Sequence, residues 1–210
     1  MFDLGETTTG LIAALGIGVA LAGAPGPVQA VILSESARGG VRRGLGAVAG
    51  ASLSFGTLLV GLALGLSALA VTGPALRVLQ VIGGAFLVWL AVDGLRSGPS
   101  ADGSEPRRLT LPPAARGSLA VLLNPGAWLF LGAVASPLIG ASAQAGGTPA
   151  AMVAALALMA GAAAGDAALA LIAGLGLRRA GRRTGAIVRR TLAAVLAVLG
   201  AWLILMGVLG

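Results

Sequence analysis

The segment Ala24-Pro25-Gly26-Pro27 lies inside an apolar run from about Leu11 to Leu33, and it limits what this chain can fold into. Each proline removes a backbone donor and clashes with the carbonyl one turn earlier, so a regular helix cannot continue through the segment. The apolar run is nevertheless long enough to cross a bilayer. A helix break at membrane depth is tolerated where the freed backbone groups face protein or a water-filled cavity. The segment therefore predicts an interrupted transmembrane helix of the kind that forms substrate sites in secondary transporters.

Composition indicates an integral membrane protein. Of the 210 residues, 57% are hydrophobic and 10% are charged, whereas soluble domains carry about 25% charged residues. Cysteine and histidine are absent, which excludes disulfides, thiolate chemistry and histidine-based metal sites or general bases. With no constellation for hydrolytic catalysis, we expect no enzyme, no catalytic residues and no cofactor. The basic residues lie in short segments between apolar spans, so they predict membrane orientation, and we expect no nucleic-acid partner.

Six apolar spans of transmembrane length follow one another along the chain, at about residues 10–34, 46–71, 75–95, 117–139, 149–175 and 187–208. The connectors after the first, third and fifth spans carry three, four and six arginines, against Arg77 alone on the other side. The positive-inside rule then places those connectors in the cytoplasm and both termini outside. We expect the protein in the cytoplasmic membrane of a prokaryote. Because Asp3 and Glu6 precede the first span and no basic residue does, we expect a retained helix and not a signal peptide.

The two halves of the chain echo each other. Ala24-Pro25-Gly26 is matched by Asn124-Pro125-Gly126, and Gly84-Ala85-Phe86 in the third span by Gly200-Ala201-Trp202 in the sixth. We therefore expect an all-α integral membrane fold of six transmembrane helices in two inverted three-helix repeats, with the first and fourth helices interrupted. Residues 1–210 would form a single domain, with halves at about 10–95 and 117–208 joined by a flexible cytoplasmic loop at about 96–116. Paired interruptions of this kind indicate a binding site between the halves.

Asp166 lies midway through the fifth span, among alanines and glycines. A carboxylate at bilayer depth costs several kcal/mol unless it is paired, hydrated or protonated. The residue is therefore a candidate proton carrier or a counter-charge for an ammonium group. The alternative is a carboxyl group that serves helix packing by hydrogen bonding to a neighbouring backbone.

Other polar residues at similar depth are weaker candidates. Gln29 follows the first break, where an amide needs partners, and Ser54 lies on the second span with Ser52 and Thr57 as neighbours. Asn124 precedes Pro125 and suits either a helix cap or a ligand contact, and Trp128 follows it one turn later.

Glu35 lies at the end of the first span, close in sequence to Arg38 and Arg42. Asp93 lies near the end of the third span, three residues before Arg96. We expect both carboxylates to form local ion pairs without a further function.

Taken together, these motifs resemble the LysE/RhtB family of amino-acid exporters. The resemblance runs from about Ala22 to the C-terminus and rests on Pro25-Gly26-Pro27, the turn Arg38-Gly39-Gly40-Val41-Arg42-Arg43-Gly44, Gly50, the segment from Leu122 to Leu129, Asp166 and the basic last connector. It implies a homodimer that exports an amino acid or related small metabolite, driven by an ion gradient. It also carries over site roles to Pro25, Gly26, Pro27, Asn124, Pro125 and Asp166.

The sequence departs from the family pattern at three positions. Val28 stands where members often carry an acidic or amide residue, Phe55 where they commonly carry an aspartate, and Gly126 where the motif often has lysine. The site is therefore less charged than is usual in the family.

The sequence thus predicts a secondary exporter of an amino acid or similar metabolite, coupled to the proton gradient. A transporter of another small solute or ion, and a membrane scaffold, are the alternatives. One deep carboxylate is few for a divalent cation, which prefers several oxygen ligands, so no metal site is expected. The predicted substrate site comprises Pro25, Gly26, Pro27, Gln29, Ser54, Asn124, Pro125 and Trp128, with Asp166 as coupling residue or counter-charge.

Overall fold

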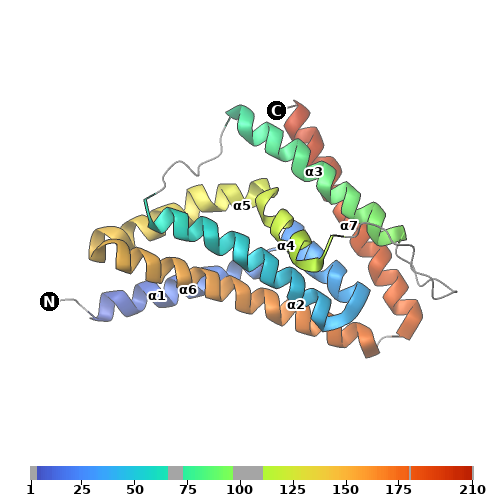
Figure 1. Ribbon diagram of the computed structural model, residues 1–210, viewed down its shortest axis with the longest axis horizontal. Helices are drawn as coiled ribbons and strands as arrows, with labels where there is room; N and C mark the ends of the chain where they lie inside the picture. Colours follow the sequence, from blue (N-terminus) through green and yellow to red (C-terminus); the bar gives the residue numbers. More distant parts are fainter. Residues whose placement is uncertain (1–3, 66–72, 97–110, 180, 210) are drawn as a thin grey trace.

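All regular structure in the described part of the chain is helical. The computed structural model describes residues 4–65, 73–96, 111–179 and 181–209, and Figure 1 shows their arrangement. In chain order the elements are α1 (Leu4–Gly23), α2 (Pro27–Ala63), α3 (Gly73–Arg96), α4 (Pro113–Leu122), α5 (Pro125–Phe130), the π-helical η2 (Leu131–Ala135), α6 (Ser136–Arg179) and α7 (Gly181–Leu209).

Helices are interrupted at both Pro-Gly motifs, as the sequence predicts. Between α1 and α2 the chain is extended at Gly26 (φ −165°, ψ −177°), and α2 starts at Pro27. Between α4 and α5, Asn124 is extended and its side chain accepts a hydrogen bond from the Gly126 N–H at 3.0 Å. Proline at the first position suits a helix start because its φ is already helical and its missing N–H would have no intrahelical partner. Asn124 is therefore the helix cap that the sequence suggested.

Both α2 and α6 fold back on themselves (Figure 1), each at a Gly-Gly pair. Gly39 and Gly40 have φ/ψ of −150°/23° and 71°/−164°, and Gly146 and Gly147 have nearly the same angles, −149°/22° and 68°/−166°. Positive φ with extended ψ is a conformation that essentially only glycine adopts, so each pair turns the chain within two residues.

Three predicted connectors are therefore wrong in extent. The residues flanking Gly39-Gly40 are helical and include Arg42 and Arg43, and helix also continues through most of residues 140–148. Likewise, α4 begins at Pro113, so Arg116 lies in a helix and is only 1% exposed, although the sequence suggested a loop position. Most of the predicted flexible loop, residues 97–110, lies outside the described residues.

Apolar helices of membrane-spanning length are present. Within the described ranges, three helical stretches have the length and composition to cross a bilayer: Pro27–Ala63, Pro125–Gly176 and Ala186–Leu209, with a shorter apolar stretch at Gly10–Gly23. Two of the three contain a Gly-Gly reversal. The prediction of six spans remains a prediction.

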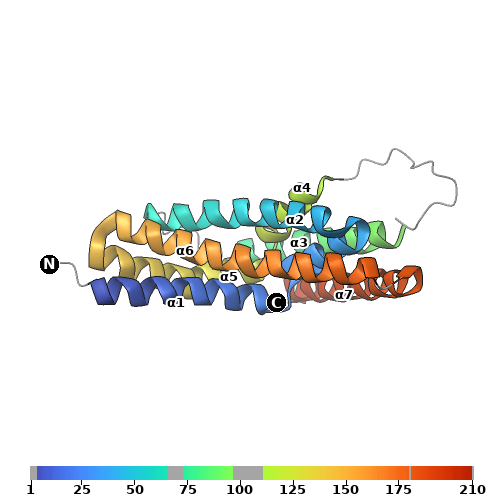
Figure 2. The same cartoon turned by 90° about the horizontal axis from the view of Figure 1, so that it is seen from below.

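Two cores hold the helices together. One joins α1, α2, α4, η2 and α6 around Leu59, Leu131 and Leu158. Of these elements, α1, α2 and α6 run roughly parallel in Figure 2. The other joins α2, α3 and α7 around Ile32, Leu87 and Leu196. Where α3 and α7 lie side by side, a Cβ on either Gly84 or Gly200 would overlap the carbonyl oxygen of the other. Glycine is needed there because the two backbones approach so closely.

Candidate functional site

A cavity of about 240 Å³ lies between the two helix breaks. Its polar lining side chains are Gln29, Ser52, Asn124 and Asp166, and the break residues Ala24, Pro25, Gly26 and Pro27 also line it. Apolar side chains, among them Leu21, Val28, Phe55, Val121 and Met159, form the rest of the wall. Drug-sized ligand pockets measure about 300–1,000 Å³, so the cavity suits a smaller metabolite.

Asp166 reaches this cavity from α6 and is the charged side chain among its described lining residues. Only 7% of the residue is exposed. Gln29 Nε2, from the first turn of α2, donates a long hydrogen bond of 3.4 Å to Asp166 Oδ1. Gln29 and Asp166 are 137 positions apart in the sequence. The first helix break and the deep carboxylate therefore meet at one site.

The N-terminus of α2 supplies the opposite polarity. The first N–H groups of a helix have no intrahelical partners and carry partial positive charge. At α5 the Asn124 side chain caps one of these groups, whereas no side chain caps the start of α2 at Gly26. Since residues 26–29 line the cavity, it offers a carboxylate and a helix N-terminus to the same small solute.

Three of the predicted site residues do not line this cavity: Ser54, Pro125 and Trp128. Ser54 is two positions from Ser52, which turns it about 200° around the helix. Trp128 donates its indole N–H to the Leu122 carbonyl at 2.8 Å, across the second break. This bond gives the tryptophan a local structural partner.

Sequence reasoning missed most of the apolar wall. Ala51, Ser52 and Phe55 share one face of α2, and Met159, Ala162 and Asp166 share one face of α6, at helical spacings of three and four. The spacing from Asp166 could have identified Met159 and Ala162. Nothing in the sequence distinguished Ser52 from Ser54, because the helix rotation was unknown.

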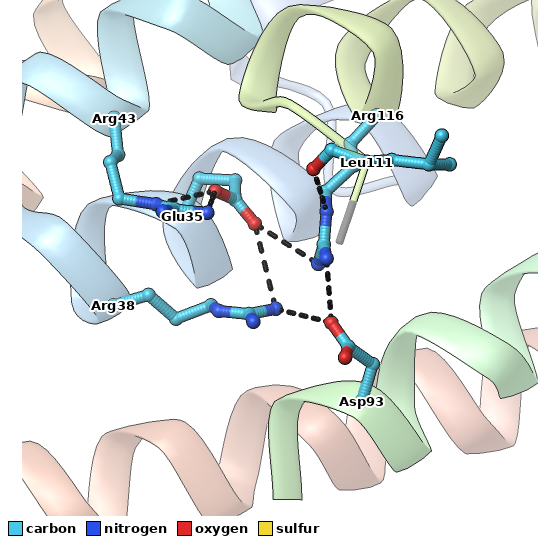
Figure 3. Close-up of polar contacts among 6 residues, drawn as sticks. All are labelled: Glu35, Arg38, Arg43, Asp93, Leu111 and Arg116. Carbon is cyan, nitrogen blue, oxygen red and sulfur yellow. Dashed lines mark hydrogen bonds and ion pairs between the residues drawn. The ribbon is translucent and has the colours of Figure 1, made fainter. Parts of the chain in front are cut away.

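A second polar cluster lies away from the cavity, and Figure 3 shows it. Glu35 pairs with Arg43 Nη2 at 2.7 Å, with Arg116 Nη1 at 3.3 Å and with Arg38 Nη1 at 3.7 Å. Asp93 Oδ2 pairs with Arg38 Nη1 and Arg116 Nη2, both at 2.7 Å. We refer to Glu35, Arg38, Arg43, Asp93 and Arg116 as the ion network.

The predicted local pair between Glu35 and Arg38 is confirmed, but the ion network extends much further through the fold than expected. Arg116 also donates from Nε to the Leu111 carbonyl at 3.0 Å, and its guanidinium lies 5.4 Å from the ring centroid of Trp89. The side chain of Arg96, the expected partner of Asp93, lies outside the described part of the structure.

A family model described as LysE type translocator matches residues 19–207, a range that contains both breaks, the cavity and the ion network. The chain belongs to the LysE type translocator family. No curated protein and no solved structure matches it. Members of this family are membrane transporters, not enzymes, and the match implies export of small solutes such as amino acids. The family resemblance and the exclusion of an enzyme are thereby confirmed for this LysE type translocator.

Proposed function

We propose that this translocator exports an amino acid or a close analogue across the cytoplasmic membrane in exchange for protons, and that the cavity between the breaks is its binding site. The observation that carries the proposal is the meeting of Asp166, Gln29 and the uncapped start of α2 in one small cavity. The predicted sites Pro25, Gly26, Pro27 and Asn124 belong to this proposal as lining residues.

A zwitterion fits the polarity of this cavity. The ammonium group would pair with Asp166, and the carboxylate would accept hydrogen bonds from N–H groups in the first turn of α2. One glutamine side chain bridges the two groups, because Gln29 belongs to that turn and contacts Asp166. The first turn of α2 and the Asp166 carboxylate are therefore about one glutamine side chain apart. This spacing suits the ammonium and carboxylate groups of a small α-amino acid, whose side chain would lie against Phe55 and Met159.

Asp166 also supplies a mechanism for exchange. A single carboxylate binds either a proton or an ammonium group, so arrival of one favours release of the other. A proton entering from outside would displace the solute outward, and loss of that proton to the cytoplasm would restore the carboxylate for the next solute. The solute and the proton would then move in opposite directions through one site.

An inverted repeat would provide the alternating access. Three pairs of features support it: the two Pro-Gly breaks, the two Gly-Gly reversals with nearly equal dihedral angles, and the packing of α1 on α6 and of α4 on α2. Glycines lie at both helix contacts, Gly18 and Gly161 in one and Gly117 and Gly50 in the other, each facing backbone of the partner helix. We further propose six spans, both termini outside, and a homodimer.

The proposal is tested with purified protein reconstituted into liposomes. An outward-directed solute flux should follow an imposed pH gradient for at least one amino acid in a panel of acidic, basic, polar and apolar members. Transport of only inorganic ions or non-amino-acid solutes would overturn the substrate assignment, and no transport of any kind would favour a scaffold.

Substitutions at the first break provide the matched variants. Pro25→Ala and Pro27→Ala should lower the flux by about 10- to 100-fold, since small displacements of binding groups cost that much. Pro137→Ala, on an exposed position of α6 outside the cavity, should leave the flux unchanged. Equal activity in all three variants would contradict a role for the break.

A further inference from the structure

We propose that the ion network is the gate that closes the cytoplasmic end of the transport path. This inference rests on the proposed function and adds a residue set outside the binding cavity. The gate would hold the first part of α2, from Pro27 to Arg38, against α3 and α4, and it would open to admit solute.

The ion network lies beyond the cavity along two separate helices. On α2 the cavity residue Gln29 and the network residue Glu35 are six positions apart, about 9 Å along the axis. On α4 the cavity residue Val121 and Arg116 are five positions apart, about 7.5 Å. The network is therefore displaced from the cavity toward the end at which the arginines cluster, which the positive-inside rule assigns to the cytoplasm.

Arg116 is the one member of the ion network that follows α3 in the chain. It belongs to α4, the helix that begins the second half of the structure. The other four, Glu35, Arg38, Arg43 and Asp93, come from α2 and α3 and consist of two carboxylates and two guanidiniums. Arg116 joins both carboxylates at once, in a position that is 1% exposed. The two ion pairs of Arg116 therefore hold α4 against α2 and α3. The four members from α2 and α3 already balance one another in charge, so Arg116 can leave without creating a net charge among them.

The segment Pro27–Arg38 is a short helix with a non-helical residue at each end. Gly26 is extended before it, and Gly39 and Gly40 form the turn after it. Gln29 at one end bonds to Asp166 in the cavity, while Glu35 and Arg38 near the other end belong to the ion network. A rigid segment between two such ends can transmit exchange at Asp166 to the network.

The part of the second half between Arg116 and Asp166 carries no charge. Residues 117–165, which include the second break and the Gly146-Gly147 reversal, contain no charged side chain. Among the described residues, the ion pairs belong to the network and so lie at one end of the cavity. This position supports the network as the closure of that end.

The test uses a chain that naturally lacks cysteine. Ser52→Cys introduces one thiol into the cavity wall, and a membrane-impermeant thiol reagent reports its access from each side in inside-out and right-side-out vesicles. We expect Arg116→Gln and Asp93→Asn, each in this background, to raise the labelling rate from the cytoplasmic side by about tenfold. A tenfold change corresponds to a loss of about 1.4 kcal/mol in the free energy that favours the closed state over the open state. Arg42→Gln is the matched control, because Arg42 is an exposed neighbour of Arg43 and lies outside the ion network as defined above.

The outcomes separate the gate from the transport proposal, because labelling needs no substrate. A raised cytoplasmic labelling rate in both network variants, with no change in Arg42→Gln, supports the gate even if no amino acid is transported. Unchanged cytoplasmic labelling in both variants overturns the gate even if amino-acid export is fully active. A rise that Arg42→Gln reproduces also overturns it, because the effect would then reflect surface charge.

Discussion

Asp166→Asn should abolish proton-driven export while the protein remains folded. Asparagine has nearly the same shape as aspartate and can still accept the hydrogen bond from Gln29, so packing in α6 is preserved. It can neither release a proton nor pair with an ammonium group. Since hydrogen bonds to charged groups contribute about 1.5–3 kcal/mol, solute affinity should fall by about 10- to 100-fold.

The measurement compares uptake driven by a pH gradient with solute exchange at equal pH in the same liposomes. Asp166→Glu, which keeps a carboxylate on a longer side chain, should retain measurable coupled flux. Coupled flux at the normal rate in Asp166→Asn would refute the role proposed for this carboxylate.

Glu35→Gln should destabilise the protein more than any other single substitution in the ion network. It removes the carboxylate that contacts Arg38, Arg43 and Arg116, so that the ion network keeps one carboxylate, Asp93, and three guanidiniums. Glu35 is 1% exposed, and removal of one partner from a buried ionic group costs about 3–5 kcal/mol. By contrast, Arg116→Gln leaves two carboxylates and two guanidiniums and should cost clearly less.

Denaturant titration of the purified protein in mild detergent would rank the two variants. Arg42→Gln should unfold like the parent chain. Because Glu35 and Arg116 are each 1% exposed, added salt should change this ranking little. A larger loss of stability in Arg116→Gln than in Glu35→Gln would show that charge balance does not govern the cluster.

Local chemistry made some features predictable. Proline cannot continue a helix whatever surrounds it, so the interruptions at Pro25 and Pro125 could be located from sequence. Asn124 could be identified as a cap because Asn before Pro at a helix start has a known geometry. The turns at Gly39-Gly40 and Gly146-Gly147 were predicted wrongly. Connectors of about ten residues were expected, whereas two glycines are enough to reverse the chain.

Features that depend on helix rotation and long-range packing could not be predicted. Ser52 and not Ser54 lines the cavity because of how α2 is rotated against α6. Arg116 was assigned to a surface connector because it follows a polar stretch, yet α4 buries it against two carboxylates from other helices. The pairing of Asp93 with Arg38 over 55 positions had no local signal.

If the cavity between the breaks is the solute site, a bound solute should protect a thiol in the cavity wall from labelling. Purified Ser52→Cys protein should react with a small alkylating reagent, and an amino acid that the protein transports should slow this reaction. At ten times its dissociation constant the solute should slow labelling by about tenfold, following simple occupancy, whereas an amino acid that is not transported should have no effect. An unchanged labelling rate in the presence of a transported solute would show that the solute binds elsewhere.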